Sequence, residues 1–227
     1  MRGNPIVNLT TTEQFHEAVE LQRIIWAFEN DAELLPARFF AVAVKIGGQA
    51  FGLYDEGKMV AFLLAIPGIK PGGMAYLHSH MMGVLPEYRN RGFGRKLKLH
   101  QRDEALARGI GLIEWTFDPL QLKNAWFNIE GLGAIVRRYL RNQYGTSTSA
   151  LQGGLPTDRL VAEWWLTADR FRPPVADRIR VPDLRTREVQ ERMANHFEAA
   201  FSRGLAVFGI VREPGAVEYL LGRVESE

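Results

Sequence analysis

Apolar residues recur along the chain at two spacings, and these spacings predict the order of helices and strands. Over residues 10–28 they fall at intervals of three and four, which is typical of an amphipathic helix. Thr10 stands three residues before Glu13, a spacing that predicts a capping box at the start of this helix. Two apolar runs joined by Asp-Glu-Gly-Lys at 55–58 predict a β-hairpin, and residues 73–85 predict a long strand.

The rest of the chain continues this mixture of element types. We expect strands over 5–9, 112–117, 134–140, 159–166 and 204–211, and helices over 36–47, 92–108, 120–132 and 184–203. A loop of small residues at 145–154 separates two of the strands, and Pro173-Pro174 interrupts the pattern later. The order predicts an α/β fold around one mixed sheet, with a main domain at 1–170 and a C-terminal extension at 171–227 packed on the same domain.

Composition narrows the class of protein. The chain has 46% apolar and 24% charged residues, which is ordinary for a globular protein, and its net charge of +2 argues against a polyelectrolyte that binds nucleic acid. The absence of cysteine excludes disulfides, thiol catalysis and cysteine-based zinc sites, and it fits a reducing cytoplasm. Because no apolar run approaches 18 residues and the N-terminus lacks a signal core, we expect a cytoplasmic protein without a membrane partner.

The stretch "VLPEYRNRGFGRKL" at 84–97 places glycines and arginines where a strand gives way to a helix. A helix N-terminus presents unpaired N–H groups, so this junction suits an anion such as phosphate. The stretch lacks the pattern of a P-loop, and leucine stands at 97 where a dinucleotide fingerprint needs a third glycine. The alternative is an arginine-rich helix start that is simply solvated.

The pattern R-x-x-G-x-G, formed by Arg89, Gly92 and Gly94, resembles the acetyl-CoA-binding motif of the GNAT superfamily of N-acyltransferases. With the order of elements, the resemblance covers about residues 5–167. It implies that backbone N–H groups of the loop wrap the coenzyme A pyrophosphate and that the preceding strand end pairs with the pantetheine arm. The cofactor-binding residues it implies are Met82, Gly83, Val84, Arg89, Asn90, Arg91, Gly92, Phe93, Gly94 and Arg95.

His78 and His80 are candidate catalytic residues on the strand before this loop. Residues two apart in a strand share a face, so both should project together with Met82 and Val84. The pair is similar to the two-histidine pattern of arylalkylamine N-acetyltransferases, which implies removal of a proton from the amine. Metal ligation and a purely structural role are alternatives, although no third metal ligand lies nearby in the sequence. Glu114 is either another base or a solubilising residue of an edge strand.

The helix predicted over 120–132 departs from the GNAT pattern. Ile129 stands where many members carry a tyrosine that acts as the general acid and protonates the departing thiolate. Tyr139 and Tyr144 are candidate substitutes or core residues. On the same helix, Asn124 is a candidate for binding the cofactor and Asn128 for binding the substrate, and both also suit helix caps.

Arg137, Arg138 and Arg141 form a second basic cluster. The planar fork of arginine matches a carboxylate, so Arg138 and Arg141 are candidate substrate-binding residues, and a solvent-facing strand is the alternative. Strand alternation places Arg138 on the opposite face from the other two.

These observations together predict an N-acyltransferase that uses acetyl-CoA or another acyl-CoA, without a metal, to acylate the primary amine of a small molecule. They predict no nucleic-acid partner and are compatible with a homodimer. The alternatives are an N-succinyltransferase acting on amino acids and an acyl-CoA-binding sensor without turnover.

Overall fold

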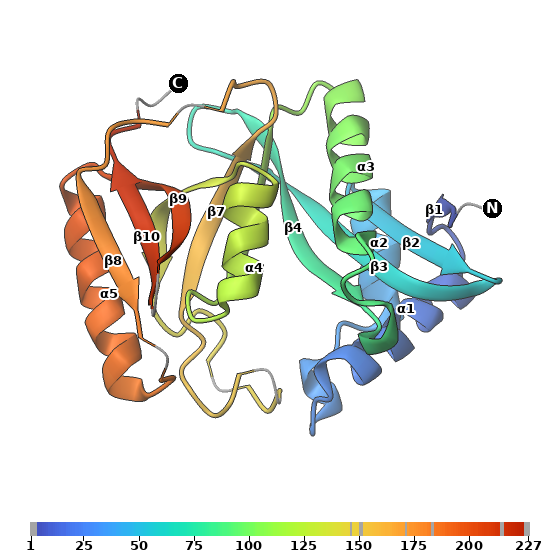
Figure 1. Cartoon of the computed structure of the whole chain (residues 1–227). Helices are drawn as coiled ribbons and strands as arrows, with labels where there is room; N and C mark the ends of the chain where they lie inside the picture. The colour runs from blue at the N-terminus through green and yellow to red at the C-terminus, as the bar shows by residue number, and fades with distance from the viewer. Residues whose placement is uncertain are drawn as a thin grey trace. The chain divides into compact units, whose positions relative to one another are not determined.

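The computed structural model describes residues 4–145, 147–149, 152–170, 172–182, 184–213 and 216–224 (Figure 1). The chain divides into two compact units, Met1–Ile113 with Thr148–Gly153 and Glu114–Ser147 with Gly154–Glu227. The predicted extension at 171–227 lies in the second unit, and its assignment as a separate part stays a prediction. Three residues of the predicted 145–154 loop, at 146, 150 and 151, lie outside the described residues.

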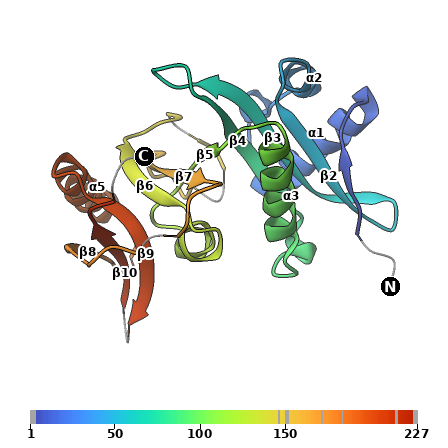
Figure 2. The same ribbon diagram turned by 90° about the horizontal axis from the view of Figure 1, so that it is seen from above.

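The first unit has an antiparallel sheet in the order β1-β2-β3-β4 with helices on both faces (Figures 1 and 2). Helices α1 and α2 lie on one face, and α3 lies on the other. The elements are β1 (Ile6–Asn8), α1 (Thr12–Trp26), η1 (Asp31–Glu33), α2 (Ala37–Lys45), β2 (Gln49–Asp55), β3 (Lys58–Ile69), β4 (Ala75–Val84), η2 (Pro86–Tyr88) and α3 (Phe93–Ala107).

A capping box begins α1, but it lies one residue later than predicted. Thr11 rather than Thr10 is the N-cap, and its Oγ1 accepts a hydrogen bond from the backbone N–H of Gln14 at 3.4 Å. In return, Oε1 of Gln14 accepts from the N–H of Thr11 at 3.1 Å. An amide at this position completes the box as well as a glutamate does, so the Thr10–Glu13 spacing was misleading.

The hairpin predicted around residues 55–58 is confirmed, and its strands β2 and β3 span Gln49–Asp55 and Lys58–Ile69. Glu56 and Gly57 form the turn with φ angles of 48° and 83°, the left-handed conformation that suits a two-residue hairpin. Behind the sheet, the buried rings of Phe15, Phe40 and Phe62 pack at centroid distances of 6.1 Å and form the centre of the first unit's core.

A β-bulge interrupts β4 near its middle. Leu64 pairs with Met81 and Ile66 pairs with His78, so Ser79 and His80 together lie opposite the single residue between those partners. An extra residue of this kind changes which later side chains face each side of the sheet. The bulge therefore breaks the simple alternation expected along this strand.

The second unit continues the chain from β5 (Leu112–Phe117), and its strands run in the order β5-β7-β6-β9-β10-β8. The remaining elements are α4 (Leu122–Trp126), the π-helical turn η3 (Phe127–Gly131), β6 (Ile135–Leu140), β7 (Arg159–Trp165), β8 (Asp177–Val181), α5 (Arg187–Ser202), β9 (Ala206–Glu213) and β10 (Ala216–Gly222). Helix α5 packs on this sheet through Phe197, whose ring lies 5.6 Å from Tyr139 and 5.3 Å from Tyr219.

The C-terminal residues complete the second unit's sheet. Val207 of β9 pairs with Val136 of β6, and β10 pairs with both β9 and β8. Strand β8 was not predicted, because its five residues give too short a pattern to distinguish from a loop. Among the described residues, no helix has the length and apolar character needed to cross a membrane.

Candidate active site

The loop between β4 and α3 has an irregular backbone, and the N-terminus of α3 that follows it has no side-chain cap. Asn90 has φ of 64° and Gly92 has φ of 80°, so the chain turns twice through the left-handed region before α3 begins. The N–H of Lys96 donates to the carbonyl oxygen of Gly92 at 2.9 Å, which starts the helix, and no side chain caps it. The N–H groups of the first helical turn therefore point out of the helix end, as in an anion site.

Space around the two glycines keeps this backbone accessible. A Cβ atom added to Gly92 meets no atom within 4 Å, and one added to Gly94 meets only Met82 at ordinary van der Waals distance, 3.4 Å. The arginines 89, 91 and 95 are exposed around the loop, and α3 has no acidic residue in its first turn. The loop at 89–95, which we call the cradle, thus combines accessible backbone N–H donors with positive charge.

Aromatic and backbone contacts shape the loop from within. The Arg91 guanidinium lies 4.9 Å from the centre of the Tyr88 ring, and that ring stacks on Phe93 at 6.0 Å. Arg89 turns back toward the strand, and its Nε donates to the carbonyl oxygen of Val84 at 3.3 Å. These contacts pack the loop residues against one another and leave Gly92 and Gly94 open.

The end of β4 contains Met82, Gly83 and Val84, the residues predicted to pair with the pantetheine arm. Gly83 also has a packing role, since a Cβ there would lie 2.6 Å from Cδ1 of Ile25 and 3.0 Å from Trp26. Met82 reaches the opposite side of the strand, beside Gly94 of α3. A side chain at 83 would therefore push α1 away from the sheet.

The two histidines lie side by side, with ring centroids 5.9 Å apart. The ring of His80 lies 6.4 Å from Phe39 of α2, whereas Met82 lies against α3, which covers the other face of the sheet. The expectation that Met82 shares a face with the histidines is therefore wrong, and the bulge in β4 is the reason. Burial lowers the pKa of His80 below its usual value, so this imidazole is neutral at pH 7.

A buried lysine that the sequence did not single out lies on the other side of this strand. Nζ of Lys98 in α3 donates to Oγ of Ser79 at 2.8 Å and to Oε1 of Gln101 at 3.1 Å. Burial holds the pKa of Lys98 well below its usual value. A lysine beside leucine in an arginine-rich helix gives no sequence signal of burial, although its spacing from Gly94, Gln101 and Ala105 places it on their face.

In the second unit, Glu114 is buried, with 3% of its surface exposed, and it forms an ion pair with Arg138. The same arginine lies 3.5 Å from Glu163, which also accepts from Nη1 of Arg137 at 2.7 Å. Glu114 is thus neither a solvated edge residue nor an isolated base. Arg138 therefore forms ion pairs with two carboxylates of the chain itself.

Arg137 and Arg138 do not face opposite sides of the sheet in the expected way. The pairing of β6 with β7 shifts between Val136 and Arg138, so Arg137 is the extra residue of a second bulge, and both arginines reach Glu163. The prediction that Arg137 and Arg141 share one face and Arg138 the other is therefore wrong, because strict alternation ends at a bulge.

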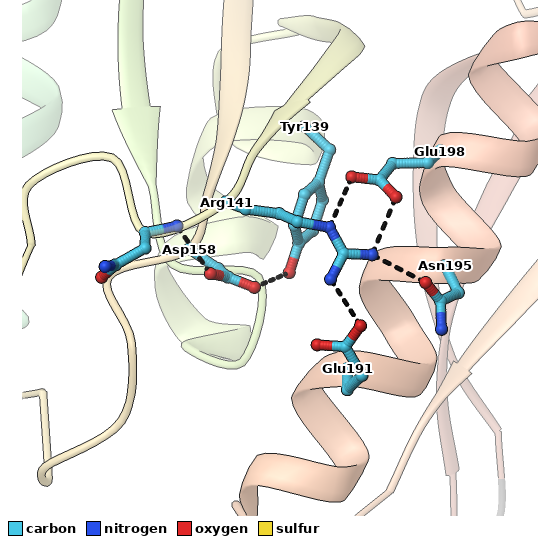
Figure 3. Close-up of polar contacts among 7 residues, drawn as sticks. Tyr139, Arg141, Asp158, Glu191, Asn195 and Glu198 are labelled. Atoms are coloured by element: carbon cyan, nitrogen blue, oxygen red, sulfur yellow. Dashed lines mark hydrogen bonds and ion pairs between the residues drawn. The ribbon is translucent and has the colours of Figure 1, made fainter.

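Arg141 is bound to the C-terminal helix (Figure 3). Its Nε donates to Glu198 at 2.7 Å, Nη1 donates to Glu191 at 2.6 Å, and Nη2 donates to Asn195 at 2.7 Å and to Glu198 at 2.8 Å. Three side chains of α5 thus accept hydrogen bonds from the Arg141 guanidinium, which was predicted to bind a substrate carboxylate.

The helical segment after β5 contains an unpaired buried donor. Asn128 is 2% exposed, and its Nδ2 has no hydrogen-bond partner among the described residues. Asn124 is exposed one turn earlier, and Ile129 is fully buried. Because a buried donor without a partner costs free energy, Asn128 marks a place where a ligand acceptor is expected.

The two tyrosines that were considered as acids differ in their surroundings. The hydroxyl of Tyr139 donates to Oδ2 of Asp158 at 2.7 Å (Figure 3), and burial together with this bond raises its pKa strongly. Tyr144 is 46% exposed, and its hydroxyl lies 2.8 Å from Oγ1 of Thr116. Tyr139 holds its proton too firmly to be an effective acid near neutral pH. Within the described ranges, no cluster of three or more His, Cys, Asp or Glu side chains has an arrangement that fits a metal ion.

Comparisons with known proteins identify the family of the chain. The model of the family described as "Acetyltransferase (GNAT) family" matches residues 12–126. No curated protein sequence matches the chain significantly.

Solved structures of acetyltransferases share the fold. The ribosomal-protein-S18-alanine N-acetyltransferase from Escherichia coli is similar with a TM-score of 0.57 and 23% identity, over 74% of this chain and 96% of that one. Naa20 from Chaetomium thermophilum, in complex with a bisubstrate analogue, gives a TM-score of 0.57 and 14% identity over 75% and 93%. An aminoglycoside 6'-acetyltransferase type Ii gives 0.56 and 18% over 73% and 99%.

At these identities the structural likeness shows the fold, and it confirms the predicted α/β architecture. The family match covers about half of the chain and includes the loop at 89–95 and both histidines. The chain belongs to the GNAT family of acetyltransferases.

Proposed function

We propose that the protein transfers an acyl group, in the first place acetyl, from coenzyme A to the primary amine of a small molecule. The observation that supports this most strongly is the cradle at 89–95, where open glycines and exposed arginines surround the uncapped start of α3. Coenzyme A carries a pyrophosphate that such a cradle suits. The thioester supplies the activated carbonyl carbon that the amine attacks.

Each predicted binding residue has a role in this proposal. Backbone N–H groups of the 89–95 loop bind the pyrophosphate, and the exposed arginines there balance its charge. The backbone of Met82–Val84 pairs with the pantetheine arm. Asn124 contacts the cofactor, and the unpaired Nδ2 of Asn128 donates to a carbonyl or hydroxyl oxygen of the acceptor.

Proton removal is assigned to the histidine pair. The amine nitrogen attacks the thioester carbonyl, the carbon–sulfur bond breaks, and the proton of the amine passes to His80 directly or through His78. A neutral imidazole is needed for this step, and the burial that lowers the pKa of His80 provides one. Glu114 suits the step less well, because its carboxylate is already paired with Arg138.

The departing sulfur needs a proton from another group. Ile129 has no proton to give, and Tyr139 is bound to Asp158. Tyr144 is the remaining tyrosine of those considered. Its exposed side chain is better placed than that of Tyr139 to give a proton to a bound substrate. We therefore assign the role of general acid to Tyr144 or to water next to it.

The roles proposed for Arg138 and Arg141 become structural. Both guanidiniums bind carboxylates of the chain itself, which removes the main reason to expect a succinyl group or an acidic acceptor at this cluster. Acetyl-CoA is therefore preferred over succinyl-CoA as the donor. A cytoplasmic location is proposed from the lack of cysteine and from the use of coenzyme A.

The proposal is tested by the release of coenzyme A thiol from acetyl-CoA and from succinyl-CoA. Each donor is combined with a panel of small primary amines and with short peptides that have a free N-terminus. Turnover with acetyl-CoA and a small amine supports the proposal. Acetylation of peptides alone would overturn the acceptor class, and tight binding without thiol release would identify a sensor.

A further inference from the structure

The second unit contains a cavity that is lined by Arg137 and by neither Arg138 nor Arg141. It has a volume of about 370 Å³ and lies at the end of the sheet where β6 begins and β7 finishes. Arg141 and Asp158 lie at the other ends of the same strands, and a strand of six residues spans roughly 20 Å. We call it the tryptophan cavity; its apolar lining includes Leu132, Ile135, Trp164, Trp165 and Phe208.

Aromatic rings give the tryptophan cavity a firm wall. Trp164 is 7% exposed and packs edge-on against Trp115 at a centroid distance of 6.2 Å. Phe208 of β9 is also buried, and Trp165 is half-buried with its Nε1 3.4 Å from Oε2 of Glu163. Pockets of a few hundred Å³ with apolar walls and a few polar groups are typical of small-molecule sites, and aromatic walls favour a ring.

The charged part of the lining is mainly cationic. Arg137 and Arg170 line the cavity, together with the exposed Asp169. The carboxylates that pair with these arginines, Glu163 and Glu130, are more deeply buried and do not line it. A ligand in the cavity therefore meets the guanidinium side of both ion pairs, which favours an anionic group.

Each of the two carboxylates, Glu163 and Glu130, has a second arginine beside it. Glu163 lies 3.5 Å from a second arginine, Arg138, and Glu130 accepts from Arg172 at 2.5 Å. Replacing Arg137 or Arg170 therefore leaves neither carboxylate without a cation. Arg170 also donates to the backbone carbonyl oxygens of Glu130 and Ile129, both at 2.9 Å, so denaturant unfolding of each variant checks the fold before its effect on a ligand is measured.

We propose that the tryptophan cavity binds a small aromatic carboxylate, with the ring against Trp165 and Phe208 and the carboxylate toward Arg137 and Arg170. This proposal does not rest on the proposed acyl transfer, and its test does not depend on turnover.

The full chain is labelled with ¹⁵N in its five tryptophan indoles and titrated with 2-naphthoate and with the neutral 2-naphthamide. Single Trp→Phe variants assign the signals. The naphthoate is expected to shift the Trp164 and Trp165 signals in one saturable step, while those of Trp26 and Trp126, which do not line the cavity, stay in place. The amide is expected to bind about tenfold more weakly, because it lacks a charge-assisted bond.

Three variants make the test specific. Arg137→Gln and Arg170→Gln should each weaken naphthoate about tenfold and leave naphthamide unchanged. Ala168→Trp, which adds an indole at a lining position, should block both probes, whereas Arg141→Lys should affect neither. Equal affinity for acid and amide, or shifts that spread over all five indoles, would overturn the proposal.

Discussion

Burial acts on His80 in the direction that a base near neutral pH requires. A buried imidazole resists protonation, so the pKa of His80 lies below that of a free histidine. The ring of His78 lies 5.9 Å from that of His80, which fits the proposed transfer of a proton between the two imidazoles. Strand alternation predicted that the two rings are neighbours, and they are, although the bulge moves Met82 to the other side of the sheet. It did not predict the contact of His80 with α2, which depends on packing between distant residues.

The histidine pair predicts a specific pH dependence. Changing both to glutamine should slow acyl transfer on the order of a hundredfold at pH 7, because the amine loses its base. The difference should shrink at high pH, where the amine is already neutral. Because burial lowers the pKa of His80, activity of the wild type should fall only below the usual histidine range. Rate–pH profiles check this, and identical profiles for both proteins would move the base elsewhere.

Arg141 provides a second prediction at the residue scale. Lysine cannot reproduce four hydrogen bonds to three side chains, so Arg141→Lys should lower the free energy of unfolding. The pairs are partly exposed and screened, so the loss should be on the order of 1 kcal/mol or less. Arg192→Lys, an exposed change on the same helix, is the control for denaturant unfolding. A raised KM for a carboxylate substrate with unchanged stability would restore the substrate role.

Helix α3 links the cradle at its N-terminus to the histidine strand at its second turn. Lys98 makes this connection through Ser79, the residue between the two histidines. Elements with strong local signals were predicted well, among them the 55–58 hairpin and the strand at 112–117. The bulges at 79–80 and 137 were not, because a bulge depends on the register of a partner strand that the local sequence does not contain.

The buried lysine predicts how the contact between α3 and β4 responds to pH. The pKa of Lys98 is lowered well below its usual value in the folded protein, so the unfolded chain binds more of this proton between that lowered pKa and about 10. The wild type should therefore gain stability relative to Lys98→Met as the pH rises from 7 to 10. Denaturant unfolding across this range measures the difference.

The control is Lys96→Met, because Lys96 is exposed on the same helix. It should show a smaller slope against pH than Lys98→Met. Equal slopes for the two variants would mean that the Lys98 ammonium is not destabilised by burial.

At the scale of the whole molecule, the sequence predicted the α/β fold and the family from one loop and the order of elements around it. It did not predict that the C-terminal residues add three strands beside β6, since β8 is short and the β6–β9 pairing joins residues about 70 positions apart. Nor did it reveal that the arginines at 138 and 141 are committed to carboxylates of this chain. Those pairings arise only when distant elements come together.

Binding of coenzyme A at the 89–95 cradle is the central claim, and isothermal titration calorimetry tests it most directly. Gly94→Trp places an indole over the helix start without backbone strain, since Gly94 lacks a positive φ and its Cβ has room. Gly111→Trp is the matched control, because it too has open space and no positive φ. We predict that wild type and Gly111→Trp bind coenzyme A alike and that folded Gly94→Trp loses binding at least about tenfold. Unchanged affinity in Gly94→Trp would contradict the claim.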